Sequence, residues 1–205
     1  MSDDTTRWWL VRHAPTVNPG RTVYGALDLD IHPPDPDAIA ALAAMLPDDP
    51  AWLVTHLSRT RATLDALLAA RGIDGAAPEI LVEPEFGEQN FGDWEGRPSA
   101  EVWDEIRAAD MKWPDDIRPP GGESFSDVAA RVSAAAHGWS DRLRGRDVVA
   151  VIHSGSVRGF LSTAMGGAPE AALAYVVDTL SVTRVDHIDG RGWRVGYVNR
   201  VALAP

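Results

Sequence analysis

The chain has 205 residues, of which 45% are hydrophobic and 24% charged, a composition typical of globular proteins and unlike that of disordered or fibrous chains. Its formal net charge of -11, from 19 basic and 30 acidic residues, disfavours nucleic acid or an anionic membrane surface as a partner. Because the sequence contains no cysteine, disulfides, thiol nucleophiles and thiolate metal sites are excluded, and we expect a cytoplasmic location.

Strand-like and helix-like patterns alternate in the N-terminal half. Short apolar runs flanked by polar or turn residues predict buried strands at Trp8–Val11, Trp52–Val54 and Ile80–Val82. Helical spacing of apolar residues predicts helices around residues 39–46 and 63–68. The first apolar run follows a polar N-terminus and is far too short for a signal peptide or a membrane span.

The segment from about residue 86 to residue 122 departs from this alternation. It contains Trp94, Trp103 and Trp113, many acidic residues and a Pro-Pro-Gly-Gly turn. This composition favours a lid inserted over the sheet. Large aromatic side chains are more often core residues than ligand contacts, so we expect these tryptophans to pack rather than to stack on a substrate.

The clearest helix starts near Ser124 and continues to about residue 143. Its apolar residues fall on one stripe, and Ser124 and Asp127 are suited to capping its N-terminus.

The C-terminal part continues the alternating pattern. A strand at Val148–Ile152 precedes a helix that continues to about Met165, and two alternating strands follow around Val182–Ile188 and Trp193–Val198. The whole pattern predicts one α/β domain over residues 1–205. We expect a three-layer sandwich in which a mixed, mostly parallel sheet has helices on both faces and carries the lid insertion.

Histidine and arginine side chains gather just after predicted strands, at the sheet edge where α/β proteins bind ligands. Arg12 and His13 follow the first strand, Arg59 follows the second after a short loop, and His153 follows the Val148–Ile152 strand. Helices that begin near residues 58 and 154 add N–H donors and a dipole that favour an anion. Since a guanidinium group can donate two hydrogen bonds to one phosphate, the sequence predicts a phosphate site here.

Six short segments of this chain occur in an order that resembles the motifs of a known family. They are Leu10–Thr16, Tyr24–Asp28, Leu57–Thr63, Glu88–Gly96, Pro120–Ser124 and His153–Arg158. Together they are similar to the motifs of the histidine phosphatase, or phosphoglycerate-mutase-like, superfamily, and the likeness spans roughly residues 8 to 160. Ala14 stands where the family usually has glycine.

The resemblance implies a mechanism and assigns its residues. His13, neutral and held by a backbone group, would attack phosphorus to form a phosphohistidine that water then hydrolyses. Arg12, Arg59 and His153, the last as a cation, would hold the phosphoryl group without a metal. Glu88 matches the position of the acid that protonates the leaving group and later activates water.

Further candidate residues lie near these motifs. Glu85 and Glu95 are rival acids, although Glu95 lies in a turn and favours a structural role. Arg158 either tunes the pocket or pairs with an acid. The candidate substrate contacts, whose alternative role is to cap turns, are Thr16, Asn18, Tyr24 and Ser154.

No metal and no cofactor are expected, because the remaining histidines lack the spacing of metal ligands. These histidines are His32, His56, His137 and His187.

The most favoured function is hydrolysis of a phosphomonoester, a small phosphorylated metabolite, through a phosphohistidine intermediate. The short chain resembles the small phosphatases of the superfamily, including α-ribazole phosphatase, which makes α-ribazole 5′-phosphate a candidate substrate. A phosphoglycerate-mutase-type phosphotransferase is the first alternative, and the few basic residues of the lid (Arg97, Arg107, Lys112 and Arg118) disfavour it. The second is a non-catalytic regulator that binds a phosphorylated ligand, which the retention of His13 and Glu88 disfavours. A homodimer is compatible with the sequence.

Overall fold

A computed structural model describes residues 4–73, 78–109, 111 and 117–202. Within these residues the chain forms one six-stranded sheet with the order β3-β2-β4-β1-β5-β6. The strands are β1 (Thr5–Arg12), β2 (Ala51–Val54), β3 (Ile80–Val82), β4 (Asp147–Ile152), β5 (Val182–Ile188) and β6 (Gly192–Arg200). The strands β1, β2, β3 and β4 run parallel to one another, whereas β5 is antiparallel to β1 and to β6. The predicted mixed, mostly parallel sheet is confirmed.

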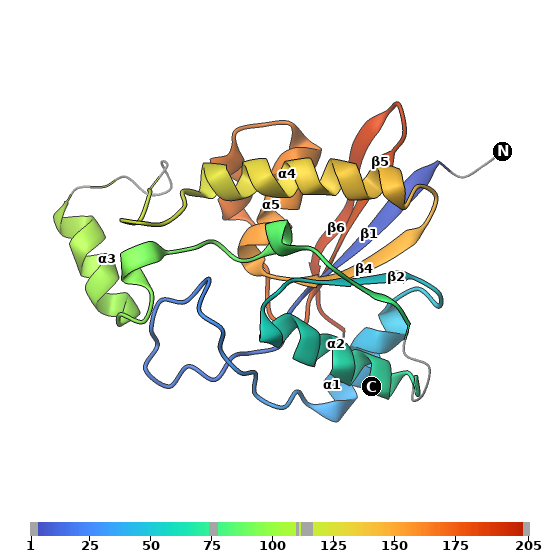
Figure 1. The fold of residues 1–205 in the computed structure, drawn as a ribbon, viewed down its shortest axis with the longest axis horizontal. Coiled ribbons are helices and arrows are strands. Elements are labelled where there is room, and N and C mark those ends of the chain that lie inside the picture. Colours follow the sequence, from blue (N-terminus) through green and yellow to red (C-terminus); the bar gives the residue numbers. More distant parts are fainter. Residues whose placement is uncertain (1–3, 74–77, 110, 112–116, 203–205) are drawn as a thin grey trace.

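Helices cover both faces of this sheet. The α-helices are α1 (Pro36–Met45), α2 (Ser58–Ala70), α3 (Ser99–Ala108), α4 (Phe125–Arg142) and α5 (Ser154–Met165). Short 3-10 helices occupy η1 (Pro84–Phe86), η2 (Gly92–Trp94) and η3 (Pro169–Ala174). Figure 1 shows α1 and α2 on one side of the sheet and α4 and α5 on the other. The predicted three-layer α/β arrangement is therefore confirmed.

Two hydrophobic cores lie on the two faces of the sheet. One contains Trp8 and Leu10 of β1 and packs against α4 and α5, while the other contains Val11 of β1 and packs against α1 and α2. Alternate residues of a strand point to opposite faces, so a strand covered on both sides is apolar at nearly every position. This explains why the central strands appear in the sequence as continuous apolar runs.

The N-terminus of α4 is capped as the sequence predicts. Ser124 is the N-cap residue, and its hydroxyl accepts a hydrogen bond of 3.3 Å from the backbone N–H of Asp127. In return, the Asp127 carboxylate accepts one of 2.8 Å from the backbone N–H of Ser124. These reciprocal bonds satisfy backbone donors that the first turn would otherwise leave unpaired.

The 86–122 segment contains a helix that the sequence patterns do not predict, α3, and Figure 1 shows it away from the sheet, at one end of the molecule. A small cluster of buried side chains, Trp94, Val102 and Ile106, packs this segment together. Trp94 packs as expected, Trp103 is 41% exposed, and Trp113 lies outside the described residues.

None of the helices in the described parts of the chain has both the length and the apolar character needed to span a bilayer.

Candidate active site

The strand β1 places His13 at the carboxyl end of the sheet. The imidazole is almost completely buried, with 1% exposed, and its Nδ1 lies 2.7 Å from the carbonyl oxygen of Ala14. The backbone N–H of Ala14 in turn donates a 2.9 Å hydrogen bond to the hydroxyl of Thr63 on α2. Because a carbonyl oxygen only accepts, Nδ1 carries the hydrogen, and a neutral His13 ring keeps its lone pair on Nε2.

The surroundings of His13 keep the ring uncharged. Burial lowers the pKa of His13 to about 3, and the positive charges of Arg59 and Arg12 act in the same direction, while the hydrogen bond to Ala14 opposes them. Burial disfavours the imidazolium because a charged ring loses more hydration than a neutral one. At neutral pH, therefore, Nε2 is available as a nucleophile.

Arg59 projects from the first turn of α2 and is completely buried. Its Nη2 donates to the carbonyl of Gly25 at 2.6 Å and its Nη1 to that of Leu27 at 2.8 Å. Asp28 fixes the same loop on the helix, because its carboxylate accepts hydrogen bonds from the N–H and the hydroxyl of Ser58 at 2.9 and 2.7 Å. The loop of the Tyr24–Asp28 motif therefore orients the guanidinium.

His153 faces His13, and their ring centres are 5.2 Å apart. The ring is fully buried, with Nε2 3.0 Å from the hydroxyl of Thr55, and its Nδ1 accepts a 3.3 Å hydrogen bond from Arg59 Nε. Burial holds the pKa of His153 well below its usual range, and Arg59 and His13 add to the effect. The expectation of a cationic His153 is therefore wrong, because its Nδ1 accepts a hydrogen bond from Arg59 and a positive ring would be desolvated beside a buried guanidinium.

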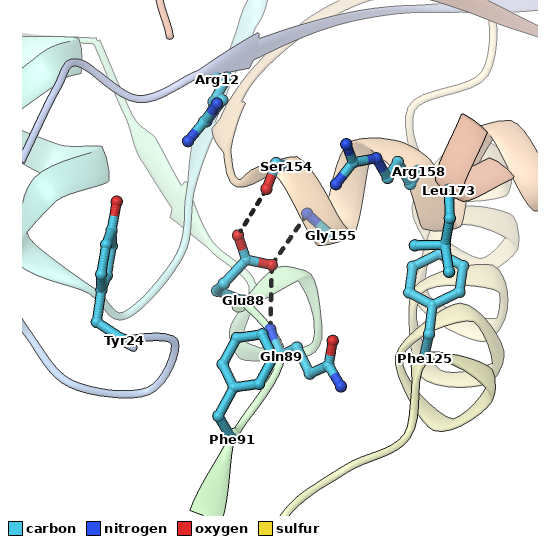
Figure 2. A pocket seen from close by; sticks show the side chains of 10 residues that line it. All are labelled: Arg12, Tyr24, Glu88, Gln89, Phe91, Phe125, Ser154, Gly155, Arg158 and Leu173. Atoms are coloured by element: carbon cyan, nitrogen blue, oxygen red, sulfur yellow. Dashed lines mark hydrogen bonds between the residues drawn. The ribbon is translucent and has the colours of Figure 1, made fainter. Parts of the chain in front are cut away.

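A cavity of about 280 Å³ lies beside these residues at the carboxyl ends of the central strands. Four predicted site residues line it, Arg12, Tyr24, Glu88 and Ser154, whereas His13, Arg59 and His153 are buried and are not among the residues that line it. The other lining residues are Gln89, Phe91, Phe125, Gly155, Arg158 and Leu173 (Figure 2).

Arg12 is the last residue of β1 and links the buried histidine to the cavity. Its Nη1 donates to the carbonyl of Val177 at 2.6 Å, while its buried Nε has no hydrogen-bond partner among the described residues. A buried donor without a partner is costly, so this N–H favours an acceptor such as a phosphoryl oxygen.

Glu88 lies at the N-terminus of α5. Its Oε1 accepts hydrogen bonds from the backbone N–H groups of Gly155 at 2.9 Å and Gln89 at 3.1 Å, and its Oε2 accepts one from the Ser154 hydroxyl at 3.2 Å (Figure 2). A β-carbon at position 155 would lie 2.2 Å from Oε1. The carboxylate can occupy this place because residue 155 is glycine.

The two rival acids lie elsewhere. Glu95 accepts hydrogen bonds from the backbone N–H groups of Ala26, Leu27 and Phe91, between 2.7 and 2.9 Å, and so has the structural role that its turn suggested. Glu85 is exposed and does not line the cavity. Glu88 is the carboxylate that the fold brings to the predicted anion site.

Arg131 on α4 holds the backbone around Glu88. Its Nη1 donates to the carbonyl of Gly87 at 2.9 Å and its Nη2 to that of Glu88 at 3.1 Å, while the carboxylate of Glu123 binds its Nε at 2.8 Å. The sequence patterns did not single out Arg131, because an arginine on the polar side of an amphipathic helix has the signature of a solvated residue.

Thr16 and Asn18 are not brought to this cavity. Thr16 forms an isolated bridge with Ile31, and the Asn18 amide donates to the carbonyl of Thr22 at 2.9 Å and accepts from its N–H at 3.0 Å. Asn18 therefore holds a turn, which was the alternative role considered for it.

Sequence reasoning missed several of the cavity residues and left Arg158 open between two roles. Arg158 lines the cavity and donates through Nε and Nη2 to the carbonyl of Tyr175 at 3.0 and 2.9 Å. Burial lowers the pKa of Arg158. The negative charge of Glu88 opposes this shift, and the positive charge of Arg12 reinforces it. Phe125 and Leu173 carry no motif, and only the fold brings α4 and η3 beside the strand ends.

The family model of the histidine phosphatase superfamily (branch 1) matches residues 8–200, which is most of the chain. The chain belongs to the histidine phosphatase superfamily. Its membership confirms the resemblance drawn from the six short motifs and the α/β fold predicted with them.

Among curated members, the chain is similar to a glucosyl-3-phosphoglycerate phosphatase of Mycolicibacterium vanbaalenii. The two are 30% identical over 168 residues, which cover 77% of this chain and 73% of that protein.

Solved structures of a phosphatase and of a mutase share the fold. A putative α-ribazole-5′-P phosphatase from Escherichia coli superposes with a TM-score of 0.78 at 22% identity, covering 98% of both chains. A phosphoglycerate mutase from Bacillus anthracis superposes with a TM-score of 0.81 at 18% identity, covering 98% of this chain and 95% of that one. At these identities the likeness shows the fold alone, so activity has to be argued from the site.

Proposed function

We propose that this protein hydrolyses phosphomonoesters through a phosphohistidine formed on His13. The observation that carries the proposal is the buried imidazole of His13, which stays neutral and directs its Nδ1–H to the Ala14 carbonyl. A ring held in this tautomer presents Nε2 as a nucleophile with no proton to remove first.

In the first step His13 Nε2 forms a bond to phosphorus while the ester P–O bond breaks. The electron pair of that bond leaves with the alcohol oxygen, which takes a proton from Glu88 in its carboxylic acid form. Arg12 and Arg59 offset the negative charge of the transferring phosphoryl group, so positioning and electrostatics supply the catalysis without a metal ion.

In the second step water attacks the phosphohistidine. Glu88, now a carboxylate, accepts the proton of the water as its oxygen bonds to phosphorus, and the P–N bond breaks to restore neutral His13. Inorganic phosphate and the alcohol are the products. The position of Glu88 at the cavity wall, where α5 and Gln89 hold its two oxygens in place, supports its contact with the ester oxygen and then with water.

The basic residues of the lid favour hydrolysis over a mutase reaction. A mutase must rebind its phosphorylated product, but Arg97 pairs with Glu105, Arg107 with Asp104 and Arg118 with Asp127. Lys112 lies outside the described residues. Arginines already paired with acids are poorly suited to hold a second anionic product.

The test is hydrolysis of p-nitrophenyl phosphate in the presence of EDTA. The wild-type protein is expected to turn over, and His13→Ala to lose activity by at least about 10³-fold, as for removal of a covalent nucleophile. His32→Ala, at an exposed histidine, is the matched control. Binding of phosphate without turnover by the wild type would favour the regulator instead, and a rate that EDTA abolishes would reveal a required metal.

The physiological substrate is best sought among small phosphorylated metabolites. The relative from M. vanbaalenii makes glucosyl-3-phosphoglycerate one test compound, and the resemblance to the small phosphatases makes α-ribazole 5′-phosphate another. A comparison of kcat/KM for both compounds ranks the two candidates directly.

A further inference from the structure

A second cavity of about 270 Å³ lies in the lid, between the loop around Tyr24 and the helix α3. It shares two aromatic residues, Tyr24 and Phe91, with the cavity that contains Arg12 and Glu88. Its remaining walls are mostly apolar and consist of Thr22, Val23, Trp94, Ser99, Val102, Trp103 and Ile106.

The two aromatic residues that both cavities share are held firmly in place. The backbone N–H of Phe91 donates to Glu95 at 2.9 Å, and the same carboxylate holds the loop after Tyr24. Gly25 packs so closely that a β-carbon there would lie 1.8 Å from the carbonyl oxygen of Gln89 and 2.8 Å from the ring of Phe91. Tyr24 is fixed from the other side, because the Arg59 guanidinium lies 5.6 Å from its ring centre. The aromatic wall is therefore preformed.

The polar groups in the lid cavity are largely used within the protein. The hydroxyl of Thr22 donates to the Asn18 side chain at 3.1 Å, and that of Ser99 donates to the carbonyl of Arg21 at 2.7 Å. A sugar with several hydroxyls would find few partners here and would lose its hydration. An apolar group would bury its surface at no such cost.

Resting on the proposed hydrolase function, we infer that the lid cavity binds the apolar part of the substrate alcohol. The phosphoryl group lies beside Arg12, the ester oxygen beside Glu88, and a flat or branched apolar group passes Tyr24 and Phe91 into the cavity. An apolar cavity of about 150 Å³ already holds benzene, so the lid cavity has room for a phenyl-sized group. Trp103, 41% exposed, leaves the cavity reachable from solvent.

The test compares 2-phenylethyl phosphate with glycerol 3-phosphate. Both are esters of aliphatic alcohols of similar acidity, so their intrinsic reactivities are close and a difference in kcat/KM reports binding of the alcohol part. The wild-type protein is expected to prefer 2-phenylethyl phosphate by about tenfold or more, the discrimination that apolar pockets reach.

Substitutions of residues that line the lid cavity test whether the preference for 2-phenylethyl phosphate arises there. Val102→Phe fills the cavity and is expected to lower the preference for 2-phenylethyl phosphate to near one. Val82→Phe, at a 54% exposed valine of β3, is the matched control and should keep the wild-type preference. Since Val102 is buried and its replacement can disturb folding, Trp103→Ala serves as a second variant, which opens one wall and should also reduce the preference.

Equal kcat/KM for the two esters in the wild type, or a wild-type preference retained in a folded Val102→Phe protein, would overturn the inference while leaving the hydrolase function intact. Failure of the wild type to hydrolyse either ester or p-nitrophenyl phosphate would instead overturn the hydrolase function on which it rests.

Discussion

At the scale of single residues, the site depends on groups kept in their uncharged or unpaired state. His13 and His153 are buried next to Arg59, and burial lowers the pKa of both rings. Arg12 keeps one buried N–H without a partner among the described residues. Such features are unfavourable for folding, and they are typical of sites arranged for a ligand rather than for stability.

The pKa of His13 predicts how stability changes with pH. The folded-state pKa is about 3 and the ordinary value is 6.5, so between these limits the unfolded chain binds a proton that the folded chain does not. Stability present above pH 6.5 is therefore lost as the pH falls, by up to about 1.4 kcal/mol per pH unit for each such histidine. Urea unfolding of His13→Asn at pH 7 and pH 5 should show a smaller pH dependence than the wild type. His32→Asn is the control, and an unchanged slope in His13→Asn would contradict this account.

Replacement of Gly155 is expected to lower kcat/KM by an amount that depends on the leaving group of the ester. In Gly155→Ala the new β-carbon would displace the Glu88 carboxylate, so proton donation to the leaving oxygen should be impaired. General acid catalysis contributes roughly 10²–10⁴-fold, so kcat/KM for alkyl phosphates should fall by about this factor. The loss should be much smaller for p-nitrophenyl phosphate, whose leaving group needs little protonation.

Gly138→Ala, where a β-carbon meets nothing within 4 Å, is the control for this glycine replacement. An equal loss on both kinds of ester would mean that Gly155 does not act through the proton donor.

At the scale of elements, the helices and strands that could be predicted are those whose apolar spacing and capping residues indicate the same element that tertiary packing stabilises. The strand Ile80–Val82 and the strand Val182–Ile188 have the predicted bounds, and α4 begins directly after its predicted cap, Ser124. By contrast, α3 has only two buried residues, Val102 and Ile106, among many polar ones, so its apolar stripe is too sparse to detect.

The cap of α4 predicts a measurable loss of stability. Ser124→Ala removes the hydroxyl that binds the N–H of Asp127, and loss of a capping side chain costs about 1 kcal/mol. Chemical denaturation should show this decrease in the free energy of unfolding. Ser133→Ala on the same helix, away from the cap, should not destabilise the protein, and equal behaviour of the two variants would argue against a capping role.

At the scale of the whole molecule, the positions of the motifs after predicted strands were enough to predict one shared site, because parallel strands end at the same edge of the sheet. Arg12, Arg59, Glu88 and His153 meet there as expected. The sequence could not predict which of these side chains line the cavity and which are buried. Motif spacing does not say which side chains the lid and the loop around Tyr24 cover. The homodimer remains a prediction, which sedimentation velocity tests.

The buried N–H of Arg12, which has no partner in the part of the chain that the structure describes, has a practical consequence for the search for ligands. Any oxyanion that supplies the missing acceptor binds the folded chain better than the unfolded one, and such linkage raises the melting temperature as the ligand concentration rises above Kd. Orthovanadate or inorganic phosphate should therefore shift the melting curve upward by a few degrees, and Arg12→Met should remove most of that shift. Ligands could then be ranked by calorimetry or dye fluorescence in the catalytically dead His13→Ala protein, where turnover cannot deplete them.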